Sequence, residues 1–115
     1  MNRLGRAEFG REGEDAAVRL LERHGFHVIA RNVRLPGGEI DVIARDRDVI
    51  AFVEVKARAS RHFGSALGAV DGRKRRKLRA LAADWLQIAA PGARARFDVV
   101  TLEAGGPRLH RGAFQ

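Results

Sequence analysis

The sequence contains no cysteine, which excludes a disulfide framework, thiolate zinc sites and cysteine nucleophiles and fits a cytoplasmic protein. Its only serines, Ser60 and Ser65, have no evident His and Asp partners for nucleophilic catalysis. No apolar run approaches the roughly 20 residues that span a bilayer, and the first residues lack the apolar core of a signal peptide. We therefore expect a soluble protein without a membrane partner.

Aromatic side chains and lysines are also scarce. One Trp and six Phe leave few exposed rings for base stacking, which speaks against a platform for single-stranded nucleic acid. The chain has nineteen Arg but only three Lys, at positions 56, 74 and 77, so arginine is its ordinary cation. A lysine in such a chain suggests a task for a compact ammonium group, such as contact with a single phosphate oxygen or a water molecule.

Positive charge is concentrated in one part of the chain. The formal net charge is +8, and residues 58–79 hold eight basic residues against one acid. Such a cluster attracts phosphate backbones, and a membrane surface is a less plausible partner because the adjoining apolar helix face is needed for the core. We expect a nucleic-acid partner, DNA rather than RNA. The alternative is a solvated helix face. The candidate nucleic-acid-binding residues are Arg58, Arg61, Arg73, Lys74, Arg76 and Lys77.

Hydrophobic periodicity predicts a single domain spanning residues 1–115. The expected elements are a helix over 5–24, strands over 26–34, 38–44 and 49–56, a helix over 71–89, a strand over 96–102 and a short edge strand over 108–111. The fold class is α/β, with an antiparallel three-strand meander and flanking helices in a mixed sheet. The second helix is a crossover, so the fourth strand can lie parallel to the third.

Four charged residues stand on the two strands that read as most buried: Glu39, Asp41, Glu54 and Lys56. Moving one ion out of water costs several kcal/mol, against a net stability of roughly 6 to 17 kcal/mol for a domain of this size. A two-residue turn sets Asp41 opposite Glu54 and Glu39 opposite Lys56, whereas a shift by two sets Glu39 opposite Glu54. In either register three carboxylates and one ammonium are expected to converge on one face.

Carboxylates this close repel one another unless a cation lies between them, and Mg²⁺ is the hard ion that their oxygens prefer. Glu14 adds a fourth carboxylate, since it lies on the inward stripe of the first helix with Val18 and Leu21. The alternative is a salt-bridged hairpin in which Lys56 pairs with one acid. One lysine cannot neutralise three acids, so a metal site is the favoured interpretation.

Several motifs resemble known families. Asp41 followed after twelve residues by Glu54-Val55-Lys56 resembles the PD-(D/E)XK nuclease superfamily, although Ile40 stands where its name has proline. A wider pattern resembles the YraN-like family of small bacterial proteins, which is similar to archaeal Holliday-junction resolvases. That pattern includes Gly10 with Glu14 and Ala17, Arg31-Asn32, Gly38–Asp41, Phe52–Lys56 with Arg58, Phe63-Gly64, Lys74, Arg96–Val100 and Ala113-Phe114.

The resemblance implies a restriction-endonuclease-like fold and a Mg²⁺- or Mn²⁺-dependent endonuclease acting on structured or branched DNA. Asp41 and Glu54 would be the metal ligands, Lys56 would orient or activate water, and Glu14 matches the first-helix acid of resolvase-like members. Glu39 has no firm counterpart and is a candidate support. Resolvase-like proteins usually act as homodimers. The alternative function is a non-catalytic nucleic-acid-binding module on the same fold.

Overall fold

The computed structural model describes residues 3–57 and 71–115, with side chains described from residue 10 onward. The elements run α, β, β, β, α, β, β, which confirms the predicted order. They are α1 (Arg3–Arg23), β1 (His27–Leu35), β2 (Gly38–Asp46), β3 (Val49–Ala57), α2 (Gly72–Ala89), β4 (Arg94–Glu103) and β5 (Gly106–Phe114). The last strand has nine residues and is longer than predicted, because its pairing with β4 extends from Gly106 to Phe114.

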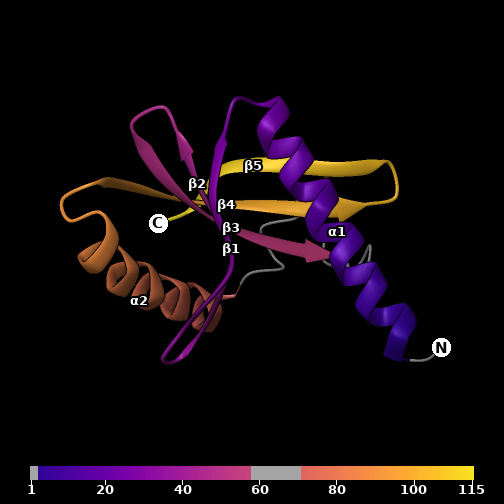
Figure 1. Ribbon diagram of the computed structural model, residues 1–115, viewed down its shortest axis with the longest axis horizontal. Coiled ribbons are helices and arrows are strands. Elements are labelled where there is room, and N and C mark those ends of the chain that lie inside the picture. Colours follow the sequence, from indigo (N-terminus) through magenta and orange to yellow (C-terminus); the bar gives the residue numbers. More distant parts are fainter. Residues whose placement is uncertain (1–2, 58–70) are drawn as a thin grey trace.

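The five strands form one mixed sheet in the order β1-β2-β3-β4-β5. β1, β2 and β3 pair antiparallel as the meander predicts, and β4 pairs parallel to β3 after the α2 crossover. β5 closes the sheet antiparallel to β4. β3 is therefore the central strand, with a neighbour on each side and a helix on each face (Figure 1).

The apolar side chains of β3 alternate between two cores. Ala51 and Val53 pack against α1 together with Leu21, whereas Ile50 and Phe52 pack against α2. This confirms the prediction that the strand is apolar on both faces, the pattern of a strand covered above and below. Glu54, which follows Val53 on this strand, is buried as well.

The end of α1 is fixed by local backbone hydrogen bonds. Gly25 has φ +87°, and its N–H donates to the carbonyl of Glu22, while the N–H of Phe26 donates to the carbonyl of Leu21. This is a Schellman motif, in which glycine adopts the left-handed conformation and an apolar contact joins the residues that flank it. Leu21 and Phe26 lie in the same core cluster, so the turn also sets where β1 begins.

α2 begins at an Asp71 cap whose side chain accepts a hydrogen bond of 2.9 Å from the N–H of Lys74. Its inner stripe includes the buried Leu78, Leu81 and Ala82, and the ring of Trp85 meets that of Phe52 edge to face at 5.8 Å. Neither helix is long and apolar enough to cross a membrane, among the residues that the structure describes.

A candidate carboxylate site where two strands separate

The hairpin of β2 and β3 adopts the first of the two predicted registers. Val42 pairs with Val53 and Asp46 with Val49, which leaves Arg47 and Asp48 as a two-residue turn. Arg47 has φ 59°, the positive value that short hairpin turns favour. The paired register ends at Val42 and Val53, so the strands separate beyond it, at the positions where the charged residues begin.

The carboxylate of Asp41 occupies this separation. Its Oδ2 accepts a hydrogen bond of 2.8 Å from the backbone N–H of Val55 on β3. A side chain therefore takes the donor that a paired strand would otherwise satisfy. Asp41 is held at the junction of the two strands, next to the segment that carries Glu54.

Glu54 is the least satisfied charged group in the described part of the chain. Only 6% of it is exposed, its Oε1 lies 3.6 Å from Nζ of Lys74, and its Oε2 has no hydrogen-bond partner among those residues. The pKa of Glu54 is raised to about 7, first by burial and then by the charge of Asp41, while the charges of Lys74 and Lys56 oppose the rise. Once Glu54 is protonated, its carboxyl group can donate a hydrogen bond to Asp41, which also favours the protonated form.

Lys56 stands in register with Thr101 of β4 and is half-buried. Its charge acts on Glu54, but more weakly than the charge of Lys74 does. Lys74, a candidate for nucleic-acid binding, lies at the edge of this site, since α2 presents its ammonium to the buried carboxylate of Glu54. Two lysines from different elements act on one glutamate.

Glu14 lies beside Asp41 and is held by β1. Its Oε1 accepts a hydrogen bond of 2.9 Å from Nδ2 of Asn32 and lies 3.4 Å from Nη2 of Arg31. A cavity of about 230 Å³ joins the two acids; it is lined by Gly10, Glu14, Asp41, Val55, Ala57 and Leu102. Glu54 is not part of this lining, so Asp41 is the group that links Glu14 to Glu54.

The expected convergence of three hairpin carboxylates is wrong. The Oε2 of Glu39 lies 3.5 Å from Nε of Arg34 on β1, and no three His, Asp or Glu side chains within residues 10–57 and 71–115 lie close enough to hold one metal ion. Asn32 has φ 52°, and Ile40 packs against α2 as Ile43 does, although the two are three residues apart. The end of the hairpin therefore departs from strict alternation and carries Glu39 elsewhere.

The pair formed by Asp41 and Glu54 fits a divalent cation. When both groups are ionised, two like charges adjoin and a buried oxygen of Glu54 lacks a partner within the described residues. Carboxylate oxygens are the donors that Mg²⁺ and Mn²⁺ accept, and Mg²⁺ is commonly held by one or two carboxylates, with water and substrate completing its coordination. Two carboxylates therefore suit an ion whose coordination is completed by water and substrate, and not an ion whose ligands all come from the protein.

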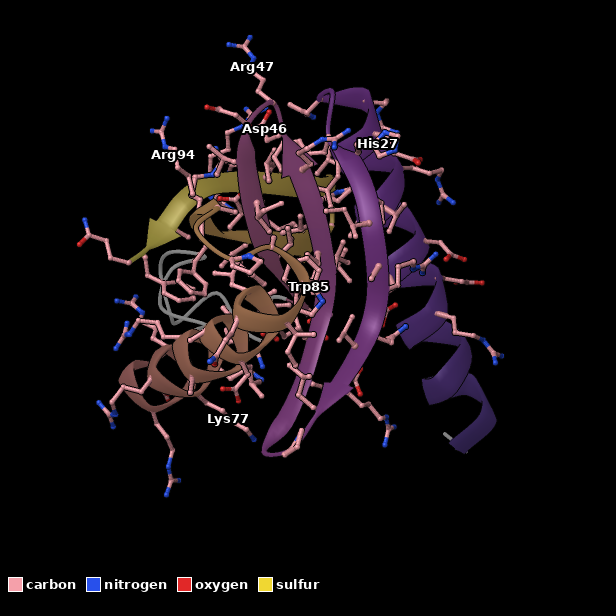
Figure 2. The ribbon with its side chains drawn as sticks, turned by 60° about the vertical axis from the view of Figure 1, so that its left-hand side comes forward. His27, Asp46, Arg47, Lys77, Trp85 and Arg94 are labelled. Carbon is pink, nitrogen blue, oxygen red and sulfur yellow. The ribbon has the colours of Figure 1, made fainter. Side chains whose placement is uncertain are left out.

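The predicted basic surface is present on α2 in part. Arg73, Arg76 and Lys77 are exposed, and Figure 2 shows Lys77 beside the turn between β1 and β2. Arg79 instead donates a hydrogen bond to the carbonyl of Gln115. The candidates Arg58 and Arg61 lie outside the described residues.

A second charged cluster was not predicted from the sequence. Asp98 is fully buried, and it accepts two hydrogen bonds of 2.8 Å from Arg96 and one of 2.8 Å from the N–H of Gly112. Arg96 also donates to Asp46, which lowers the pKa of that carboxyl, and Arg111 lies 3.3 Å from the same oxygen. The spacing of Arg96 and Asp98 on one face of a strand could have indicated that these two residues pair. It could not have indicated their distant partners Asp46, Arg111 and Gly112.

A mixed five-stranded sheet between two helices, with an acid and a Glu-x-Lys segment on adjacent strands, defines a restriction-endonuclease-like α/β fold. Residues 13–102 match the family described as "Uncharacterised protein family UPF0102". The chain belongs to this family, which confirms the YraN-like membership that the motifs indicate.

The relatives have a similar length. A UPF0102 protein of Desulfosudis oleivorans is 44% identical over 112 residues, which is 95% of this chain and 91% of the relative. A UPF0102 protein of Moorella thermoacetica is 42% identical over 112 residues, covering 91% of this chain and 93% of the relative. A UPF0102 protein of Geobacter metallireducens is 45% identical over 98 residues, covering 84% and 80%. The similarity therefore includes the strands that carry Asp41, Glu54 and Lys56.

Proposed function

We propose that the protein is a metal-dependent endonuclease that hydrolyses phosphodiester bonds, with Asp41 and Glu54 as ligands of Mg²⁺ or Mn²⁺. The observation that carries the proposal is the buried Oε2 of Glu54, which lacks a partner in the described part of the chain beside a second carboxylate. A group this deeply buried destabilises the fold unless something pairs with it. A bound cation would pair with both carboxylates, whereas the contact with Lys74 leaves Oε2 of Glu54 without a partner in the described part of the chain.

Each residue then has a separate task. When bound, the ion supplies Lewis-acid chemistry by lowering the pKa of a coordinated water and stabilising charge on the phosphate. Asp41 is oriented for its task by the N–H of Val55, which fixes one of its oxygens. Lys56 follows Glu54 on the same strand, and its ammonium orients the attacking water and offsets charge that develops there. Glu14 places a further carboxylate on the lining of the adjoining cavity.

The exposed basic residues of α2 would hold the nucleic-acid backbone. Arg73, Arg76 and Lys77 are available to phosphate oxygens, and such contacts position a duplex without reading its sequence. DNA that is branched or otherwise structured is the substrate class that best fits a reader of backbone and shape. The exposed large apolar side chains of the described residues, Ile29 and Ile88, are not aromatic and offer no stacking platform.

The test is a cleavage assay on linear, nicked, flapped and four-way DNA and on RNA, each with Mg²⁺, Mn²⁺ or Ca²⁺. We expect Glu54→Gln and Lys56→Met each to lower the cleavage rate by about 100-fold or more while nucleic-acid binding is kept. Glu39→Gln is the matched control, because it removes the same charge from the same hairpin at a residue paired with Arg34.

Three outcomes separate the functions. Metal-dependent cleavage that is lost in both site variants and kept in the control supports the proposal. Binding without cleavage under any ion supports instead a nucleic-acid-binding module on a nuclease fold. Equal cleavage by the wild type and both site variants would mean that another part of the protein, or a contaminant, performs the reaction.

A further inference from the structure

The three lysines of the chain are not spread over its surface. Lys56 and Lys74 both act on the charge of Glu54. The third, Lys77, lies against the turn between β1 and β2, where a Cβ added at Gly38 would come within 2.7 Å of its Cε. Only Lys74 brings its ammonium to an oxygen of Glu54, at 3.6 Å, and it comes from a different element.

The contact between Lys74 and Glu54 is anchored at one end and loose at the other. The backbone N–H of Lys74 is fixed by the Asp71 cap at 2.9 Å, whereas the side chain is 38% exposed and its Nζ lies 3.6 Å from Oε1, longer than a hydrogen bond between charged groups. A flexible four-carbon stem therefore joins a fixed backbone to a charge that can move away from the carboxylate when another cation replaces it.

A second buried carboxylate in this protein, that of Asp98, has hydrogen bonds to both of its oxygens. Asp98 receives two hydrogen bonds of 2.8 Å from the planar guanidinium of Arg96, which leaves no room for an ion at those oxygens. Arginine is the ordinary cation of this chain, yet a lysine faces Glu54. The pair of Asp98 and Arg96 is therefore held by two short hydrogen bonds, whereas in the pair of Glu54 and Lys74 another cation can replace the ammonium.

From this comparison, and resting on the function proposed above, we propose that Lys74 is a displaceable cation of the metal site. Its ammonium offsets the charge of Glu54 while the site holds no metal ion, and it leaves Glu54 when a divalent ion binds. Lys74 then lies at the N-terminal end of α2, beside the exposed Arg73 and Arg76, where a phosphate of the substrate can accept it. Lys74 is thus a positioning residue that couples metal binding to grip on nucleic acid.

Calorimetric titration with Mn²⁺, in the absence of nucleic acid, tests the first half. Removal of an ammonium about 4 Å from the ligand oxygen should tighten Mn²⁺ binding by roughly tenfold at low salt in Lys74→Met, after allowance for solvent screening. Lys74→Arg should weaken Mn²⁺ binding, because a guanidinium can hold both oxygens of Glu54. Lys77→Met is the matched control for loss of one charge from α2 and should change the affinity by less than about twofold.

The outcomes distinguish this inference from the proposed function. If neither the wild type nor Lys74→Met binds Mn²⁺, both are overturned. If the wild type binds Mn²⁺ through Glu54 but Lys74→Met binds no more tightly than Lys77→Met does, the inference alone is overturned. Binding by Lys74→Met that exceeds both the wild type and the Lys77→Met control supports it, including the case in which the wild type binds too weakly to measure.

A second measurement tests the transfer to nucleic acid. A short DNA duplex is titrated with and without Ca²⁺, which occupies oxygen sites and is expected to support binding without cleavage. Lys74→Met should weaken DNA binding several-fold only when Ca²⁺ is present, whereas Lys77→Met should weaken it equally in both conditions. A loss of affinity in Lys74→Met that is the same with and without Ca²⁺ would make Lys74 an ordinary backbone contact and overturn the coupling. Far-ultraviolet circular dichroism of each variant shows that the fold is kept.

Discussion

At two interruptions of strand pairing, an aspartate side chain accepts a hydrogen bond of 2.8 Å from a backbone N–H of the neighbouring strand. Asp98 accepts from Gly112, where the pairing of β4 with β5 shifts register, and Asp41 accepts from Val55, where the pairing of β2 with β3 ends. Beside Asp98 the next charged group is Arg96, whereas beside Asp41 it is Glu54. The same local device is thus surrounded by opposite charge in one place and by like charge in the other.

This difference indicates that the cluster around Asp98 stabilises the fold. Asp98 and Arg96 satisfy one another, and the cluster continues to Asp46 and Arg111, whose guanidinium lies 5.1 Å from the ring of Phe26. Figure 2 shows Asp46 at the opposite end of the sheet from Lys77. This cluster joins the end of α1 to β2, β4 and β5, and the oxygens of its buried Asp98 are taken by Arg96 and by the N–H of Gly112. The pair of Asp41 and Glu54 instead brings two like charges together, and the proposed metal ion would offset them.

The largest expected effect is on the satisfied cluster. Asp98→Asn removes the charge that faces Arg96 in a fully buried position, and breaking one partner of a buried pair costs about 3 to 5 kcal/mol. That is a large share of a net stability of roughly 6 to 17 kcal/mol. We expect a correspondingly lower free energy of unfolding in a denaturant titration, with Mn²⁺ affinity unchanged in the folded fraction.

The control for this prediction is Asp48→Asn. Asp48 also pairs with an arginine, Arg94 at 3.5 Å, but both side chains are 77% exposed. Exposed pairs of this kind contribute about 0 to 1 kcal/mol, so the control should change stability little. If Asp98→Asn were no more destabilising than Asp48→Asn, the contrast between a satisfied structural cluster and an unsatisfied site would lose its basis.

The second effect has the opposite sign. Glu54→Gln should stabilise the metal-free protein at pH 8 by up to about 3 kcal/mol, because each unit of pKa shift corresponds to about 1.4 kcal/mol. The pKa of Glu54 rises from its ordinary value of 4.5 to about 7 on folding. The same substitution should abolish Mn²⁺ binding. A residue that serves only as a structural salt bridge to Lys74 would behave in the reverse way and destabilise the protein when changed.

The pH dependence follows from the same shift. Between pH 4.5 and about 7 the folded protein holds a proton on Glu54 that the unfolded chain has lost. Stability therefore falls as pH rises through this window and is constant above it, as far as Glu54 is concerned. The difference in unfolding free energy between wild type and Glu54→Gln, measured by urea titration from pH 4 to pH 8, isolates this contribution. A difference that does not depend on pH would show that the pKa of Glu54 is not raised.

Much of the fold could be predicted because local patterns determine it. Period-two alternation located β2 and β3, the two-residue turn fixed their register, and the crossover helix made β4 parallel to β3. The role of Glu39 could not be predicted in this way. Alternation was extended past Val42 to the start of β2, but the pairing with β3 ends at Val42 and Asn32 on the neighbouring β1 has a positive φ, so Glu39 does not keep the expected face.

The candidate site was predicted in part for a related reason. Asp41, Glu54 and Lys56 follow from spacing along two adjacent strands, and the stripe of α2 places Lys74 near them. The partners of Asp98 are scattered: Arg96 lies two residues away, Gly112 lies fourteen residues away and Asp46 lies on β2. Such clusters depend on tertiary approach, and periodicity along one element does not contain that information.

The smallest expected effect concerns Glu39. A variant of this residue tests whether three hairpin carboxylates converge, as the sequence predicts, or whether only Asp41 and Glu54 adjoin, as in the structure. Glu39→Gln removes a half-exposed carboxylate whose partner, Arg34, is 87% exposed, so stability should change by no more than about 0.5 kcal/mol. Mn²⁺ affinity should also be unchanged, because Glu39 does not join Asp41 and Glu54 in a group that could hold one ion. Asp41→Asn, two residues further along the same strand, should abolish that affinity, and calorimetry on the two variants measures both effects. Equal losses of Mn²⁺ affinity in the two variants would mean that Glu39, Asp41 and Glu54 share the ion in solution. The start of β2, which carries Glu39, would then turn toward the site when the ion binds.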